Sequence, residues 1–502
     1  MKLPDSHPEF TRRQFIKTSA GFAAAAAVAP ASLSSAQTAA EKPAAKKIIG
    51  IQAGTVSFVD EGVEQALDIF QEKGAINAVY LATYTYDRGL DGRGQPLPDH
   101  GKQESDARNY HGGDYATPHA EFYHNTILKP ERAPDFGDLD IVATLLPPMN
   151  KRGMKLFCSI QDSFTYRENS PGMQNLTEVD LQGNRTRTLC LCHPDVRAFW
   201  PALATDLCKS YDIDGIAFFN EHNGPLLNAI GASHAQRIDS SRVTCFCEFH
   251  QKAARASGIS IDRAKEGYRT LDRFVKNSLA DKRPSDGYFV EFWRLLVEYP
   301  EIIAWDKLFD QGKHQVLADV YAAVKSVRKE LQVAFHIEHV NSFNPIFRAT
   351  RSYADLATKA DLLKVVVYNN CGGGRYASFI RNINSTVFRD VSREELLQFN
   401  NHLLNYANEA PLNELARAGL SPDYVFRETQ RALNGVNGAC KILPGIDIDI
   451  PAGRKASPDD AYAATAAGLK AGADGILYSR KYSEMRLANL GAAGKAVRDF
   501  KA

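Results

Sequence analysis

Eight short apolar runs alternate with longer amphipathic segments along most of the chain, and this alternation constrains the fold more than any other feature. The segments between the runs have apolar residues at helical spacing, as in residues 63–74 and 459–472. Strands separated by helices pair in parallel, with the helices outside the sheet. Eight such units predict an α/β fold of the (β/α)8 barrel type. An open doubly wound sheet is the alternative, but no Gly-x-Gly-x-x-Gly pattern follows the first run. The expected strands lie within residues 47–55, 78–86, 154–164, 215–222, 331–342, 362–370, 440–450 and 475–484.

Polar residues at the ends of these runs form a second pattern. The run 215–219 passes directly into Asn220, Glu221 and His222, and six other runs end in polar groups too. The carboxyl ends of barrel strands meet at one mouth, where barrel enzymes carry their sites, so these side chains are expected to share a pocket. Charged groups gathered at a mouth are costly unless they are paired or used. Beyond those three, the expected site residues are Tyr84, Asp162, His336, Glu338, Asn341, Asn369, Asp447, Asp449, Tyr478 and Arg480.

The N-terminus predicts export. Arg12 and Arg13 precede an Ala-rich apolar stretch, and the segment Thr-Arg-Arg-Gln-Phe-Ile-Lys resembles a twin-arginine signal. Ser34 and Ala36 fit the small residues of a cleavage site. We therefore expect the twin-arginine export machinery as a partner and a periplasmic or secreted location. The expected segments are a signal peptide over residues 1–36, a linker over 37–47 and a barrel catalytic domain over 48–502.

Composition excludes two classes of partner. The chain of 502 residues is 44% hydrophobic and 24% charged, which is typical of a globular protein. Its formal net charge of +1 gives no basic footprint for a nucleic acid. No stretch beyond the N-terminus approaches the roughly 18 uninterrupted apolar residues of a membrane span.

Three connections after strands are long: residues 87–140, 223–314 and 371–439. The first holds four histidines among Gly, Asp and Tyr, and a loop of this length is typical of a lid or a binding wall. The third opens with three consecutive glycines, Gly372 to Gly374, but lacks the Lys-Ser/Thr of a phosphate loop. We interpret that run as a tight turn that lets the backbone approach a ligand.

With the strand ends in view, the chain resembles the clan A glycoside hydrolases. It is most similar to an uncharacterised glycosyl-hydrolase-like barrel group and more distantly similar to family 42 β-galactosidases. The clan's fourth strand ends in Asn-Glu, here Asn220 and Glu221. The resemblance implies that Glu221 is the general acid/base and that Asn220 contacts the sugar. The clan's seventh-strand nucleophilic Glu is missing, since the run there offers Asp447 and Asp449, and its eighth-strand Trp is missing too.

Glycosidic cleavage can also be argued from the chemistry of these carboxyl groups. It needs one carboxyl group that stays protonated and one that is ionised. Glu221 follows Phe218 and Phe219 directly, an apolar setting that favours the protonated form. Asp447 and Asp449 share a strand face by the period of two and are expected near Arg480 and Lys481, which favours ionisation. Glu338 on the fifth strand is a rival partner.

Two Cys-x-Cys pairs suggest a second, structural site. Cys245, Cys247 and His250 have the crowding that tetrahedral Zn²⁺ needs, with Cys192 or Cys190 as the fourth ligand. Family 42 members carry a similar Cys cluster beyond the fourth strand. A disulfide between the two pairs, or plain buried cysteines, explains the same residues. Any zinc there would be structural, so hydrolysis by paired carboxylates is expected to need no cofactor.

Two other functions remain open. His336, Glu338, His339, Asp447 and Asp449 have the ligand types of a catalytic divalent metal, as in sugar isomerases or epimerases built on this barrel. Alternatively, the barrel binds carbohydrate without turnover, which the missing seventh-strand Glu favours.

Overall fold

The computed structural model describes residues 47–86, 99–101, 111–162, 173–234, 238–240, 243–450 and 455–501. The expected signal peptide and nearly all of the expected linker lie outside these residues, as does part of the long connection 87–140.

Eight parallel strands close into a barrel, which confirms the expected fold class. Each strand pairs with its neighbours in chain order, and β1 pairs with both β2 and the last strand. The short antiparallel strand β3 (Gly113–Asp114) is added to β2 at Tyr84 and Thr85. All eight expected runs form strands. Their bounds are β1 Ile48–Ala53, β2 Ala78–Thr85, β4 Lys155–Asp162, β7 Gly215–Asn220, β8 Gln332–Ile337, β9 Leu362–Val366, β10 Lys441–Asp447 and β11 Gly475–Ser479.

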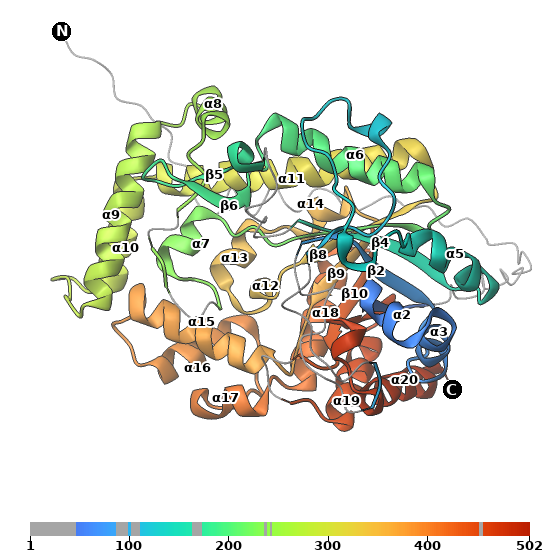
Figure 1. The fold of residues 1–502 in the computed structure, drawn as a ribbon. Coiled ribbons are helices and arrows are strands. Elements are labelled where there is room, and N and C mark those ends of the chain that lie inside the picture. Colours follow the sequence, from blue (N-terminus) through green and yellow to red (C-terminus); the bar gives the residue numbers. More distant parts are fainter. Residues whose placement is uncertain are drawn as a thin grey trace, which may run out of the picture. The chain divides into compact units, whose positions relative to one another are not determined.

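Helices surround the strands, as Figure 1 shows. The outward faces of the strands and the inner faces of the helices share one continuous apolar core. The helices after the first three barrel strands are α2 Thr55–Glu61, α3 Val63–Glu72, α5 Ile141–Lys151 and α6 Pro194–Ser210. After the fourth strand come α7 Pro225–Ile230, α8 Glu248–Ala256, α9 Ile261–Leu279, α10 Tyr288–Glu298 and α11 Glu301–Val327. The remaining helices are α12 Val340–Phe343, α13 Pro345–Thr350, α14 Tyr353–Ala357, α15 Gly372–Thr386, α16 Arg393–Leu404, α17 Leu412–Ala418, α18 Pro422–Val436, α19 Pro458–Lys470 and α20 Leu487–Lys501.

The lower interior of the barrel is filled by apolar side chains. All eight barrel strands contribute to this layer, in which the rings of Tyr80 and Phe157 stack with centroids 4.6 Å apart. Replacing a fully buried Phe by Ala typically costs about 3–5 kcal/mol, so this plug is a large part of barrel stability. The plug fills the interior toward the amino ends of the strands, and the interior cavity lies nearer their carboxyl ends.

The three-glycine run after β9 differs from the expected tight turn. Gly372 to Gly374 form the first turn of α15, and none of them has a positive φ. A Cβ on Gly373 would lie 2.0 Å from the backbone oxygen of Leu415 in α17. The glycines therefore allow two helices to pack closely, and the interpretation as a ligand-binding turn is wrong.

Within the described ranges, no helix combines the length and the apolar character needed to cross a bilayer.

Candidate active site

A polar cavity of about 240 Å³ opens at the carboxyl ends of the barrel strands. It lies above the apolar plug, and side chains from at least five barrel strands or their following loops reach it. Several of the expected site residues are brought together here, while others face elsewhere. The polar lining residues are Gln52, Gln161, Asp162, Glu221, Asn223, Ser233, His234, His336, Glu338, His339, Lys364, Tyr368, Arg375 and Arg480.

Glu221 lies directly after β7 and is hydrogen-bonded to His336 on the neighbouring strand β8. The distance from Oε1 of Glu221 to Nε2 of His336 is 2.6 Å. The Glu221 side chain is 46% exposed, and this exposed surface faces the cavity, whereas His336 is buried. Burial raises the pKa of the Glu221 carboxyl, but the hydrogen bond and charge of His336, with help from Arg375, outweigh burial and lower it. The expected apolar neighbourhood is therefore replaced by a histidine that favours the ionised carboxylate.

Asp162, the last residue of β4, contacts Asn220 and His222, the other two polar residues at the carboxyl end of β7. Its carboxylate accepts a hydrogen bond from Nδ2 of Asn220 and lies 2.9 Å from Nε2 of His222. Burial lowers the pKa of His222, but Asp162 and Glu178 outweigh burial and raise it to about 9. Asp162 lines the cavity, whereas Asn220 and His222 turn toward Asp162 and are absent from the described lining. Both residues therefore act on the site through Asp162.

A lysine that the sequence reasoning missed lies at the floor of the cavity. Lys364, on β9, donates to Oε1 of Gln52 at 2.7 Å and to the hydroxyl of Tyr368 at 3.1 Å. Ser479 donates to the same Gln52 oxygen at 2.8 Å. The signal for Lys364 is its place in an apolar strand: the period of two puts it on the same face as Leu362, which belongs to the interior plug.

The two seventh-strand aspartates lie outside the cavity. Asp447 accepts hydrogen bonds from the backbone amides of Asn370 at 3.1 Å and Cys371 at 2.7 Å, and so holds the loop before α15. Burial raises the pKa of Asp447 to about 6. Asp449 is ion-paired with Arg486 at 2.6 Å and bonded to the side chain of Asn489. The period of two does not carry Asp449 onto the same face as Asp447, because β10 ends at Asp447.

Glu338 does line the cavity, but it is paired. Its carboxylate is bonded to the ammonium group of Lys313, and Arg351 lies 4.0 Å away. Burial raises the pKa of Glu338, and the charges of Lys313 and Arg351 outweigh burial and lower it.

Four further expected residues are placed away from the cavity. A register shift between Ala82 and Tyr84 turns the Tyr84 ring toward Phe199 and Trp200 of α6. Tyr478 is buried in the core between the strands and the helices, because the neighbouring Leu477 takes the interior position on β11. The side-chain oxygen of Asn341 accepts a bond from Arg431, and the backbone oxygen of Asn369 accepts one from the amide of Leu420. Arg480, in contrast to these four residues, lines the cavity.

The five residues proposed as ligands of a catalytic metal have separate partners. His336 faces Glu221, Glu338 faces Lys313, and His339 contacts Tyr424 through Nε2 at 3.1 Å and Arg375 through Nδ1. Asp447 and Asp449 are held as described above. Among the described residues, the group with metal-binding geometry is instead formed by cysteines.

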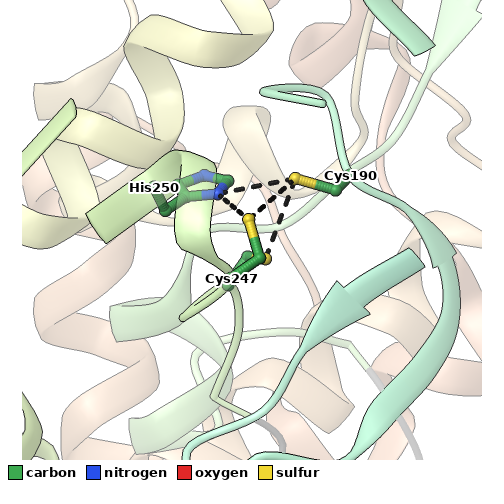
Figure 2. A group of neighbouring side chains, drawn as sticks. Cys190, Cys247 and His250 are labelled. Carbon is green, nitrogen blue, oxygen red and sulfur yellow. Dashed lines mark hydrogen bonds between the residues drawn. The ribbon is translucent and has the colours of Figure 1, made fainter. Parts of the chain in front are cut away.

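Cys190, Cys245, Cys247 and His250 form this group, whose donor atoms all lie within 4.8 Å of one another. Figure 2 shows His250 and the cysteine sulfur atoms converging at the start of α8. The sulfur of Cys190 is 3.5 Å from that of Cys247 and 3.8 Å from that of Cys245. Tetrahedral zinc with Zn–S bonds of about 2.3 Å needs donors roughly 3.8 Å apart, so the spacing fits.

Cys190, rather than Cys192, occupies the fourth corner of this cluster. Cys192 lies 3.4 Å from Nε2 of His250, the ring nitrogen opposite the one near the other sulfurs. It can therefore orient the imidazole without sharing its ligand atom. All eight cysteines are free thiols in the structure. If zinc binds, these four residues would hold it, and it would brace the loop 243–247 against the β5–β6 hairpin.

That hairpin connects the cysteine cluster to the cavity. Strand β5 (Thr177–Val179) pairs with β6 (Arg185–Leu189). The amide of Val179 donates to the sulfur of Cys245 at 3.2 Å, and Thr244 donates to Glu178 at 2.7 Å. Glu178 in turn lies 3.6 Å from Nδ1 of His222. A continuous chain of contacts therefore runs from the cluster through Glu178 and His222 to Asp162.

Comparisons with known proteins bear mainly on export. Residues 9–29 match the TAT (twin-arginine translocation) pathway signal sequence, which confirms the expected signal. The signal directs the protein to the periplasm or the cell exterior. The chain's sequence matches no curated protein.

Solved structures of glycoside hydrolases are similar to this chain over most of its length. The PgaB (BpsB) glycoside hydrolase domain from Bordetella bronchiseptica is 12% identical, with a TM-score of 0.47, 90% of this chain covered and 98% of that one. An α-L-fucosidase from Paenibacillus thiaminolyticus is 12% identical, with a TM-score of 0.47 and coverage of 91% and 49%. A β-galactosidase from Halorubrum lacusprofundi is 11% identical, with a TM-score of 0.49 and coverage of 90% and 58%. The chain thus spans about half the length of the last two. The barrel itself is established by the order and parallel pairing of its strands.

Proposed function

We propose that the protein is an exported glycoside hydrolase in which Glu221 is the general acid/base. The observation that carries the proposal is the position of Glu221: it follows the fourth barrel strand, faces the polar cavity and is hydrogen-bonded to His336. A carboxyl group at the mouth of a barrel can reach a substrate held there. The plug of apolar side chains below keeps the reaction at this end.

In the free protein the hydrogen bond and charge of His336 outweigh burial and lower the pKa of Glu221, so its carboxylate is ionised. A substrate that displaces the His336 contact removes this effect. The pKa of Glu221 then rises, and the carboxyl can bind the proton that it donates to the glycosidic oxygen. Glu221 then accepts a proton from the attacking water, as a general acid/base does in both halves of a reaction.

The partner carboxylate comes from the cavity lining. Asp162 and Glu338 are the lining carboxylates besides Glu221 among the described residues, whereas Asp447 and Asp449 serve structural contacts. Asp162 carries one imidazole neighbour, while Glu338 already contacts two cations. Asp162 therefore has more capacity to meet a developing positive charge on a sugar ring.

A series of carboxylate-to-amide variants tests the proposal. Hydrolysis of a panel of aryl and natural glycosides is measured for Glu221→Gln, Asp162→Asn and Glu338→Gln, with Asp449→Asn as the control outside the cavity. We expect Glu221→Gln and the partner's variant each to lose about 10²–10⁴-fold in rate. Asp449→Asn should retain turnover at matched folded fraction. No loss in Glu221→Gln would reject Glu221 as the general acid/base, and no turnover by the unsubstituted protein on any glycoside would favour carbohydrate binding without turnover.

A further inference from the structure

Lys364 is a buried lysine on the inner face of the barrel. It is the middle residue of β9 and is 3% exposed, directly above the apolar plug. Gly445 on β10 makes room for its stem, since a Cβ there would lie 2.9 Å from Cε of Lys364. The side chain therefore reaches the cavity floor in a space bounded by neighbouring strands.

The partners of Lys364 are neutral, unlike those of Lys313 and Lys481, the two other buried lysines in the described part of the chain. Lys313 pairs with Glu338, and Lys481 lies 3.5 Å from Glu484. Lys364 instead bonds to Gln52 and Tyr368, and among the described residues no carboxylate lies within ion-pairing distance of it. A buried charge without a counter-ion is costly, so the amine loses its proton readily. Burial lowers the pKa of Lys364 to about 7, with Glu221 opposing this and Arg480 and Arg375 adding to it.

Two guanidinium groups line the same cavity. Arg375 belongs to the first turn of α15 and also contacts His339, and Arg480 follows β11. Planar guanidinium groups bind carboxylates. A ligand with a carboxylate near these arginines would have its other end close to Lys364 and to the Glu221–His336 pair.

We propose that Lys364 is a nucleophilic amine that condenses with a small aldehyde or ketone carrying a carboxylate. The neutral nitrogen attacks the carbonyl carbon, forming a C–N bond as the C=O π bond becomes a C–OH group. One N–H proton moves to the oxygen as this group forms. The carbinolamine then loses water: the remaining N–H proton and the hydroxyl depart as the C–O bond breaks, and a C=N double bond remains. The hydroxyl of Tyr368, 3.1 Å from Nζ, relays a proton from the nitrogen to the departing oxygen. This activity is separate from glycoside hydrolysis and does not rest on it.

Reductive trapping tests the proposal on the whole protein. The protein is incubated with pyruvate and sodium cyanoborohydride across the pH range from about 5 to about 9, and hydroxyacetone serves as a carbonyl probe without a carboxylate. Intact mass and peptide mapping then locate the adduct. We expect a single reduced adduct on Lys364, with a yield that rises through about pH 7 and is higher for pyruvate.

Lys313 is the internal control, because it is equally buried but paired with Glu338, and it should stay unlabelled in the same peptide map. Lys364→Met should abolish the adduct, and the map of the unsubstituted protein decides the question even if that variant does not fold. Adducts spread over exposed lysines with none on Lys364 would overturn the proposal. Labelling of Lys364 that rises only near the ordinary lysine pKa would do so as well. Equal labelling by hydroxyacetone would overturn the requirement for a carboxylate.

Discussion

Glu221 and His336 face each other from neighbouring strands, with Oε1 and Nε2 only 2.6 Å apart. The parallel register produces this pairing: Phe218 lies opposite Phe335, so His336 comes one residue beyond the pair and Glu221 three. His336 is buried and packs near the Phe219 ring, so the pair is held from one side while Glu221 remains open to the cavity. The position of one proton between these two groups is central to the proposed reaction.

Replacing His336 should move the pH dependence of activity. In His336→Asn, the hydrogen bond and charge that lower the pKa of Glu221 are lost, so the pKa of Glu221 rises. A general acid must be protonated, so the basic limb of kcat/KM that Glu221 sets should move to higher pH in this variant. The pH profile on an aryl glycoside checks this. A basic limb that stays in place would show that His336 does not control Glu221.

The His222–Asp162 pair should make stability depend on pH. The pKa of His222 is raised to about 9 in the folded protein, above the ordinary unfolded value of about 6.5. A raised folded pKa means that the stabilisation is complete below about pH 6.5 and is lost as pH rises through about 9. Breaking a buried ion pair typically costs about 3–5 kcal/mol.

His222→Gln removes the titrating group, so the free energy of unfolding of this variant can be compared with that of the unsubstituted protein at each pH. Urea unfolding of the variant and the unsubstituted protein should differ by several kcal/mol near pH 6 and by much less near pH 10. A difference that stays constant over this range would contradict the assignment of a charged His222.

The cysteine cluster should bind one zinc ion per chain. The four donors have the spacing of a tetrahedral site, and the cluster braces the hairpin that carries Glu178. Elemental analysis should find zinc in the unsubstituted protein and in Cys440→Ala, whose cysteine lies outside the cluster. Cys247→Ser should lose the metal, and chelation should lower the melting temperature. Two results would contradict the prediction: a protein that contains no zinc and has all its cysteines reduced, or a protein in which thiol titration reveals a disulfide.

The sequence predicted the barrel well because hydrophobic periodicity is a local property. All eight runs form strands, and each strand is followed by at least one helix before the next barrel strand begins. It was harder to predict which partner each side chain contacts when the two residues are far apart in the sequence. Asp447 is the last residue of its strand and Glu221 comes directly after its own, yet the Asp447 carboxylate accepts hydrogen bonds from the amides before α15. Nothing in the local sequence separates these two uses of an acidic residue at a strand end.

Three other differences have specific physical causes. A register shift on β2 turns Tyr84 outward, and such a shift depends on the neighbouring strand. Sequence spacing does not decide whether Cys190 or Cys192 is the fourth member of the cysteine cluster. The fold after β6 brings Cys190 to the cluster and leaves Cys192 beside the other ring nitrogen of His250. Lys364 was missed because a single lysine in an apolar strand usually lies at the edge of a sheet. Here it points into the barrel, because Gly445 on the neighbouring strand has no side chain to occupy that space.

The most direct measurement of the central claim is the turnover of Glu221→Gln on two aryl glycosides that differ only in leaving group. If Glu221 and His336 deliver the proton, the glycoside with the poor leaving group should lose about 10²–10⁴-fold, while the activated one loses clearly less because its leaving group needs little protonation. The variant should keep the melting temperature of the unsubstituted protein, since the Glu221 side chain is half open to the cavity. Equal losses on both substrates, or near-full turnover on the poor one, would contradict the assignment of Glu221 as the general acid/base.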